Sequence, residues 1–286
     1  MQGNIPDDVR HDYGGKCWWC GAVADSREHR YKRSDLNREF GSGTWRDHDA
    51  VVRVVDGTEI RIQGSNSKNV KFEKNLCANC NNARSQPFDL AYDEFMTYIR
   101  EHEDRIVADQ SFELSHIFGA NWTSRRKLLE RYIVKYICCR LAEDRVKIPT
   151  SVIEYLDDPN QPYPPHLSIW LEIRLDIYDL MKQSNEDGFS GGSLWKGDML
   201  VNISQSRRTI EEAWSFYGYR WLRINYRLDT RTRIGKTNFY RDKVQLPVDR
   251  NLSARALQEH FKRVKAEKGL PRGANPGDLP SKTDSP

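Results

Sequence analysis

The sequence predicts an α+β protein, and three kinds of pattern lead to this expectation. Segments 87–99 and 123–142 place apolar residues at helical spacing. Segments 169–177 and 221–228 alternate apolar and mostly polar residues, as a half-buried strand does. The Asp-Gly pair at 56–57 separates two β-prone runs and supplies a tight turn, so it predicts a β-hairpin.

Length and composition limit the class of protein. A chain of 286 residues exceeds one small module and favours about two domains. Mean hydropathy is −0.79 and no apolar run approaches the roughly 18 residues of a membrane span, which excludes a transmembrane helix. The first 16 residues contain no apolar stretch, so we expect no secretory signal and a cytoplasmic location. In a reducing compartment paired cysteines usually hold metal.

The small net charge of +4 hides local asymmetry. Segment 125–147 carries eight Lys or Arg against three acidic residues, and segment 207–243 carries ten against four. Phosphate contacts dominate nucleic-acid affinity, so these stretches would face a polyanion. Charged surfaces that are merely solvated are the alternative. The candidate phosphate contacts include Arg125, Arg126, Arg220 and Arg223.

Within the N-terminal half, residues 1–16 are polar and Gly-rich and predict an irregular arm. The hairpin is expected at 51–55 and 58–63, followed by a loop at 64–67. Pro87 fits a first helical turn, and Thr123 is a candidate N-cap for the second helix, which is expected to reach about Ala142.

Proline residues at 149–165 then break the chain before the strand predicted at 169–177. Further strands are expected at 200–203 and 221–228, and a short amphipathic helix at 252–268. Residues 269–286 are rich in Pro, Gly, Ser and Asp, so a disordered tail is expected.

Four cysteines form two C-x-x-C knuckles, Cys17/Cys20 and Cys77/Cys80. Each knuckle places two thiolates on a tight turn, and two such turns complete a tetrahedral site for a structural Zn²⁺. A redox C-x-x-C would need a thioredoxin-like βαβ context, which the pattern does not offer. Cys138 and Cys139 lack knuckle spacing and are expected to be ordinary buried residues.

Around the knuckles, Glu28-His29 follows the first one, and Asn81 with Arg84 follows the second. This order resembles the HNH endonucleases, the ββα-metal nuclease family, over about residues 17–95. The resemblance implies an N-terminal zinc-bound ββα-metal module with the hairpin as an insertion, at about 17–108. An α+β region at 109–268, helical with a small antiparallel sheet, would follow. We expect that region to serve target choice, homodimerisation or binding of a partner protein.

The resemblance also implies a site chemistry. His29 would be the general base, Glu28 and Asn81 would hold a catalytic Mg²⁺ or Mn²⁺, and Arg84 would contact phosphate. The residue types suit this, because a His of near-neutral pKa can accept a proton from water and hard oxygen ligands suit these metals. Adjacent residues of a strand point to opposite faces, so Glu28 and His29 need a twist or bulge to serve one site.

Several assignments stay open. The middle Asn of the motif is Asn75 or Asn69, Asn82 is the alternative to Asn81, and Asp47-His48 is a rival acid–His pair. Arg30 follows the acid–His pair where the family often has an apolar residue, and Pro87 interrupts the helix expected after Asn81. The resemblance predicts a DNA endonuclease, with bacterial phage defence or restriction as its setting. A zinc-stabilised nucleic-acid-binding protein without cleavage is the alternative.

Overall fold

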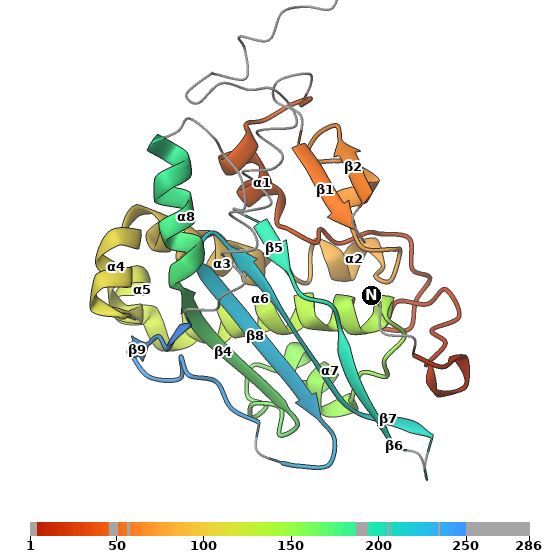
Figure 1. The fold of residues 1–286 in the computed structure, drawn as a ribbon. Helices are drawn as coiled ribbons and strands as arrows, with labels where there is room; N and C mark the ends of the chain where they lie inside the picture. Colours follow the sequence, from red (N-terminus) through yellow and green to blue (C-terminus); the bar gives the residue numbers. More distant parts are fainter. Residues whose placement is uncertain are drawn as a thin grey trace, which may run out of the picture.

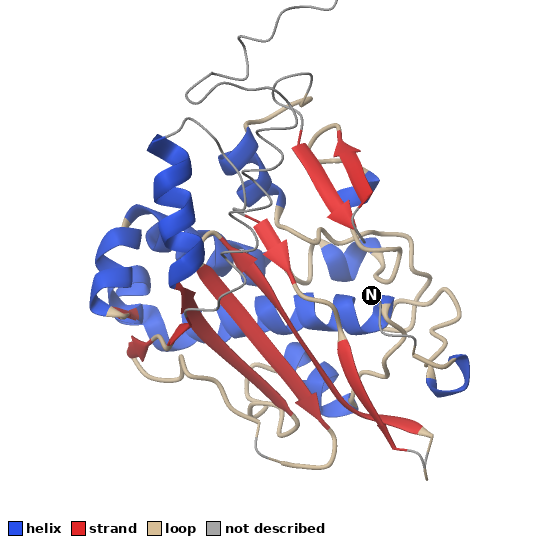
Figure 2. Cartoon of the chain, viewed as in Figure 1, coloured by secondary structure: helices blue, strands red, loops and turns tan. Residues whose placement is uncertain are grey.

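The computed structural model describes residues 5–45, 51–55, 58–186, 194–204, 206, 208–233 and 235–249. Its fold is α+β, with a layer of helices behind a mixed sheet and a smaller N-terminal part beside them (Figure 1). Most helices come from the middle of the chain and the long strands from its last third, and Figure 2 shows both kinds of element in one view. No helix among the described residues is long and apolar enough to cross a membrane.

The N-terminal part is mostly extended chain held together by short elements. After the 3₁₀ turn η1 (Asp7–Val9) come helix α1 (Arg33–Phe40) and the strands β1 (Val51–Val55) and β2 (Thr58–Ile62). The two strands pair antiparallel, which confirms the predicted hairpin. The 3₁₀ turn η3 (Lys68–Val70) and the one-turn helix α2 (Ala78–Asn81) follow.

Helices make up the middle of the chain. Helix α3 (Gln86–Glu101) begins with Pro87 in its first turn, so α2 and α3 are separate helices, as Pro87 predicted. After it come α4 (Glu103–Asp109), strand β3 (Ser111–Glu113) and α5 (Leu114–Phe118). The turn η4 (Gly119–Asn121) leads into α6 (Trp122–Glu143), and α7 (Thr150–Asp157) follows.

The last third of the described chain forms a six-stranded sheet. Its order is β10-β4-β8-β7-β5, and β6 also pairs with β7. All neighbours are antiparallel except β10 and β4, which are parallel, and β3 and β9 form a separate antiparallel pair. The bounds are β4 Leu167–Arg174, β5 Leu194–Lys196, β6 Leu200–Ser204, β7 Thr209–Tyr219, β8 Leu222–Asp229, β9 Lys243–Gln245 and β10 Val248–Asp249.

Helix α6 lies at the centre of the molecule. Every residue from Leu129 to Ala142 is buried, so this helix has neighbours on all sides. On one side the ring of Tyr92 in α3 stacks on that of Tyr132, with 3.9 Å between ring centroids. On another, the ring of Tyr136 lies 4.2 Å from that of Tyr217 in β7. One continuous hydrophobic core therefore joins the knuckle region, the helices and one face of the sheet.

Two predicted elements differ from the structure. The strand predicted at 169–177 ends at Arg174, and helix α8 (Leu175–Glu186) begins at once. Asp176 accounts for the change, because its carboxylate accepts the backbone N–H of Ile177 at 2.9 Å and lies in the first turn, where negative charge stabilises a helix. The sheet is also larger than predicted, because β5, β7 and β10 are added to the three strands that the sequence indicates.

The described residues of the predicted arm, 5–16, are mostly irregular, but they are attached to the core. Ile5 is buried, and the backbone N–H of His11 donates to the carbonyl of Arg145 at 2.7 Å. The hydroxyl of Tyr13 donates to the carbonyl of Val146 at 2.8 Å. The predicted helix at 252–268 and the predicted tail at 269–286 lie outside the described residues.

Candidate metal centre and the His29 strand

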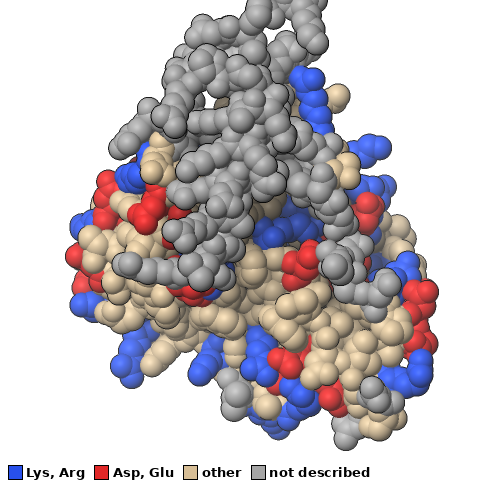
Figure 3. All heavy atoms as spheres, viewed as in Figure 1, with Lys and Arg blue, Asp and Glu red and all other residues tan. Residues whose placement is uncertain are grey.

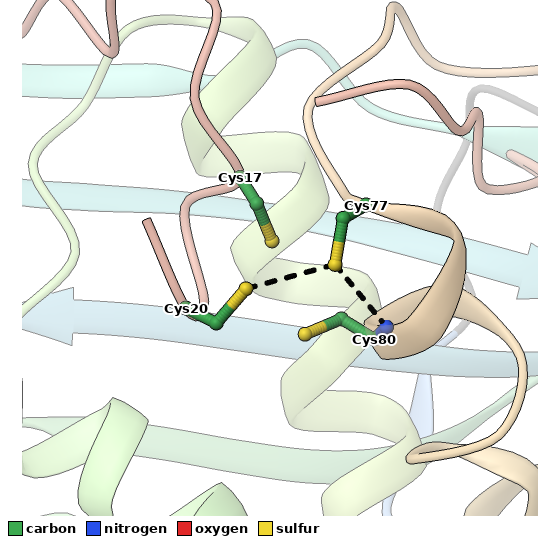
Figure 4. A group of neighbouring side chains, drawn as sticks. All are labelled: Cys17, Cys20, Cys77 and Cys80. Carbon is green, nitrogen blue, oxygen red and sulfur yellow. Dashed lines mark hydrogen bonds between the residues drawn. The ribbon is translucent and has the colours of Figure 1, made fainter. Parts of the chain in front are cut away.

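The four knuckle cysteines converge, as their spacing predicts. Their Sγ atoms all lie within 4.8 Å of one another and point toward a common centre (Figure 4). The Sγ atoms of Cys20 and Cys77 are 3.6 Å apart, close to the roughly 3.8 Å expected between thiolates of a tetrahedral zinc site. The backbone N–H of Cys80 donates to the Sγ of Cys77 at 3.4 Å. The group could hold a metal ion such as zinc.

Arg84 completes the surroundings of this centre. One of its guanidinium nitrogens donates to the Sγ of Cys80 at 3.7 Å, and the group lies 4.6 Å from the ring centroid of Trp19. Its other nitrogen pairs with Asp157 of α7, which also accepts the indole N–H of Trp19 at 2.5 Å. Arg84 therefore offsets thiolate charge and attaches the knuckles to α7. The predicted phosphate contact would require it to leave these partners.

His29 lies on an extended segment, 26–30, that runs antiparallel to residues 70–76. Isolated bridges pair Ser26 with Leu76 and His29 with Lys71. The ring Nε2 of His29 lies 3.1 Å from the carbonyl oxygen of Ser65. A carbonyl only accepts, so neutral His29 carries its proton on Nε2 and leaves the Nδ1 lone pair open. No described residue hydrogen-bonds to Nδ1.

The surroundings also favour the neutral ring. Burial is the main factor that lowers the pKa of His29. The nearby charges of Lys71 and Arg33 lower this pKa further, against the opposite effect of Glu28. Because the ordinary pKa of a His is near 6.5, the ring is neutral at pH 7 and able to accept a proton.

Glu28 has two partners within the protein. Its Oε1 accepts the backbone N–H of His29 at 2.9 Å, and its Oε2 lies 2.6 Å from the ammonium of Lys135 in α6. Lys135 is 1% exposed and also contacts Asp89 of α3 at 3.7 Å and the hydroxyl of Ser85 at 3.0 Å. The cation that Glu28 holds is therefore a buried ammonium, which needs such carboxylates to offset its desolvation.

The asparagines of the predicted site are placed differently from one another. Asn81, at the end of α2, donates to the hydroxyl of Ser26 at 2.9 Å, while its buried Oδ1 has no hydrogen-bond partner among the described residues. Its carbonyl accepts from Ser85, which also contacts Lys135, so Asn81 and Glu28 are linked through two side chains. Asn75 is buried and donates to the carbonyl of Cys139 at 2.9 Å, which holds the knuckle strand against α6.

The remaining alternatives lie apart from this link. Asn82 donates to the carbonyl of Ala78 within its own turn, and the backbone of Asn69 is part of turn η3. The rival pair Asp47-His48 lies outside the described residues.

The residues expected to hold a catalytic Mg²⁺ or Mn²⁺ do not form a ready-made site. The open Oδ1 of Asn81 suits a cation, but both oxygens of Glu28 already have donors. Among the residues that the structure describes, the four cysteines are the one group of three or more His, Cys, Asp or Glu side chains placed to hold a metal ion. A catalytic metal at Glu28 would have to replace Lys135.

The arginines predicted to face a polyanion have acidic partners within the protein. Arg125 pairs with Glu94 and Arg126 with Glu130. Arg220 pairs with Glu103 and Glu39, and Arg223 with Glu172 and Asp249. Along the lower edge of the face in Figure 3, basic side chains predominate, with acidic side chains among them.

Lys135 and Ser65 are contacts of the site that sequence reasoning missed. Lys135 carries a detectable signal, because it is a lysine within the apolar run of a helix at positions where apolar side chains recur. Ser65 contributes only its backbone carbonyl, for which the sequence carries no signal.

Comparison with protein-family models gave no match. A comparison with curated proteins and one with solved structures also found nothing similar. The site must therefore be interpreted from its own geometry and from the motif order in the sequence.

Proposed function

We propose that this protein is a zinc-stabilised nuclease of the HNH type that hydrolyses phosphodiester bonds in DNA. The observation that carries the proposal is the hydrogen bond from Nε2 of His29 to the carbonyl of Ser65. It orients a neutral ring with an open Nδ1, which is what a general base needs in order to take a proton from water. The antiparallel segments 26–30 and 70–76, followed by α2 with Asn81, also agree with a ββα order.

The test is cleavage of supercoiled plasmid DNA in the presence of Mg²⁺ or Mn²⁺, with a chelator control and a single-stranded RNA arm. One site that activates one water cuts one strand, so nicked circles should precede linear DNA. His29→Ala should lower the nicking rate about 10² to 10⁴-fold, because the base acts in the chemical step, while DNA affinity stays unchanged.

The matched control is His116→Ala. His116 lies on α5 with an exposed side chain and pairs with Glu113, so this variant should cut at the normal rate. His48→Ala tests the rival acid–His pair in the same assay. Normal cutting by His29→Ala together with loss of cutting by His48→Ala would transfer the role of base to His48.

A second candidate function is nucleic-acid binding without cleavage, and the Glu28–Lys135 pair favours it. If Lys135 keeps Glu28 permanently, the carboxylate next to His29 is not free to bind a catalytic metal. Such a protein would retard DNA in a gel and leave the plasmid supercoiled under every metal condition. Nicking that a chelator abolishes would eliminate this candidate.

A further inference from the structure

Most of the basic side chains near His29 are held by acidic partners. Arg27 pairs with Glu73 at 3.1 Å, and Arg30 pairs with Glu143. Lys32 lies 3.1 Å from Asp93 and 3.3 Å from Asp89. Arg38, farther along α1, pairs with Asp35 at 2.9 Å. The carboxylate partners offset the charge of these cations, so the cations attract an external anion only weakly.

Arg33 and Lys71 differ from these neighbours, because neither forms an ion pair with a carboxylate in the part of the chain that the structure describes. Lys71 is the cross-strand partner of His29, and directly opposed residues of antiparallel chains project to the same face. Arg33 is exposed and opens helix α1, four residues after His29. Both charges act on the His29 ring.

Two cations without a carboxylate partner among the described residues, next to a neutral ring, make a local excess of positive charge. In water such charges attract a counter-ion, and a phosphodiester offers anionic oxygens that both can bind. A guanidinium can bind two phosphate oxygens at once, and an ammonium acts as a point charge. The arginines at 84, 125, 126, 220 and 223 are already paired, so they do not compete for this role.

We infer that Arg33 and Lys71 form the phosphate subsite of the His29 centre and hold a DNA phosphodiester next to the ring. The inference rests on the proposed function for the identity of the ligand. The motif order assigns the phosphate contact to Arg84. In this proposal Arg33 and Lys71 make that contact instead. They would position the substrate, while His29 would act on the water.

The test compares two double variants of equal charge change. Arg33→Gln/Lys71→Gln removes the subsite, and Arg233→Gln/Lys236→Gln removes an exposed Arg and an exposed Lys from the loop after β8. Binding of a fluorescent DNA duplex of about 20 base pairs is measured by anisotropy across a salt series, without added Mg²⁺ or Mn²⁺ and without a chelator, so that a structural zinc stays bound. Plasmid nicking with Mg²⁺ or Mn²⁺ is measured in parallel.

Loss of the subsite should weaken binding about tenfold or more and reduce the slope of log Kd against log salt by about 2, while the control pair stays close to the wild type. Equal affinities and equal slopes for the two double variants would overturn the inference, and so would a wild type that does not bind DNA. Selective weakening in a protein that never nicks DNA would keep the subsite and remove the nuclease proposal.

Discussion

At the scale of single residues, two buried charges near the His29 segment are balanced in different ways. Lys135 contacts two carboxylates, and its pKa is raised because Glu28 and Asp89 outweigh the effect of burial. Asp35 accepts hydrogen bonds from the hydroxyl of Tyr92 and from Arg38, both at 2.9 Å. Burial nevertheless dominates there and raises the pKa of Asp35 to about 6. Asp35 thus lowers stability when it is charged.

Asp35 gives a prediction for pH dependence. The pKa of this carboxyl in the folded state is above its unfolded value of 3.8, so its contribution to stability increases as pH falls through about 6 and is complete below about 4. Between pH 7 and pH 5 the wild type should gain about 1 kcal/mol from this group, and Asp35→Asn should lack that gain. Urea unfolding of both proteins at the two pH values measures the difference. Parallel pH dependences would show that Asp35 keeps its ordinary pKa.

At the scale of elements, the knuckles join segments that have little regular secondary structure of their own. The first knuckle lies in a turn, and the second begins the one-turn helix α2. Trp18 and Trp19 are buried beside them in the main core, with their rings stacked at 5.6 Å. Packing of the two Trp rings therefore supports the knuckle turns. Without a metal, however, four thiol groups would lie within 4.8 Å of one another with no ligand to hold them together. We expect metal binding to contribute strongly to the folding of this part.

Removal of the metal gives the second prediction. Cys80→Ser should reduce the zinc content well below one per chain and lower the midpoint of thermal unfolding strongly, because binding energy at such a site is folding energy. Cys138→Ala is the control, because Cys138 is buried in α6 and is not one of the four converging cysteines, so this variant should keep one zinc per chain. Metal analysis and calorimetry check both variants. A folded wild type that contains no zinc before chelation would refute the prediction.

The elements also show what the sequence could predict. Helix α6, the hairpin and strands β4 and β8 follow apolar patterns, because regular burial produces regular spacing. Strand β7 was not predicted, because the residues of its buried face differ little in hydrophobicity from those between them. The buried face carries Ala213, Ser215, Tyr217 and Tyr219. Helix α1 escaped because Leu36 is its one buried apolar residue.

The site also has features that the sequence predicts and features that it does not. Local spacing brings the four cysteines together, and it also predicts that Cys138 and Cys139 are buried. The partners of Glu28 and Arg84 come from α6 and α7, more than 70 residues away, and only the tertiary structure supplies them. For this reason the motif order could indicate that Glu28 lies beside His29. It could not indicate that Lys135 pairs with Glu28.

At the scale of the whole molecule, the predicted boundary near residue 108 crosses a continuous core. The buried side chains of α3, among them Phe88, Tyr92 and Phe95, belong to the same cluster as α6 and the sheet. A fragment that ends at the boundary would expose this apolar surface to water. Burial of a large side chain is worth about 1.5–3 kcal/mol, and a domain of this size has only about 5–15 kcal/mol of stability.

The third prediction follows from this shared core. A fragment of residues 1–108 with zinc present should show no cooperative thermal transition and should bind a dye for exposed apolar surface, while the full chain unfolds in one main transition. Calorimetry and dye fluorescence on both proteins provide the measurement. A sharp transition in the fragment would establish the N-terminal part as an independent domain.

The two cysteine knuckles lie far apart in the chain, so a metal bound between them closes a long loop. Cys20 and Cys77 are 57 residues apart, so a bound metal would close a long loop that contains both His29 and the hairpin. Loop-closure entropy grows only logarithmically, so removal of residues 51–62 would change its cost by about 0.2 kcal/mol. Chain entropy thus sets almost no limit on the length of this loop. Contacts within the loop constrain it instead. They include the carbonyl of Ser65, the backbone hydrogen bond from Arg30 to Val70, and the small cluster of Leu36, Trp45, Ile62 and Val70.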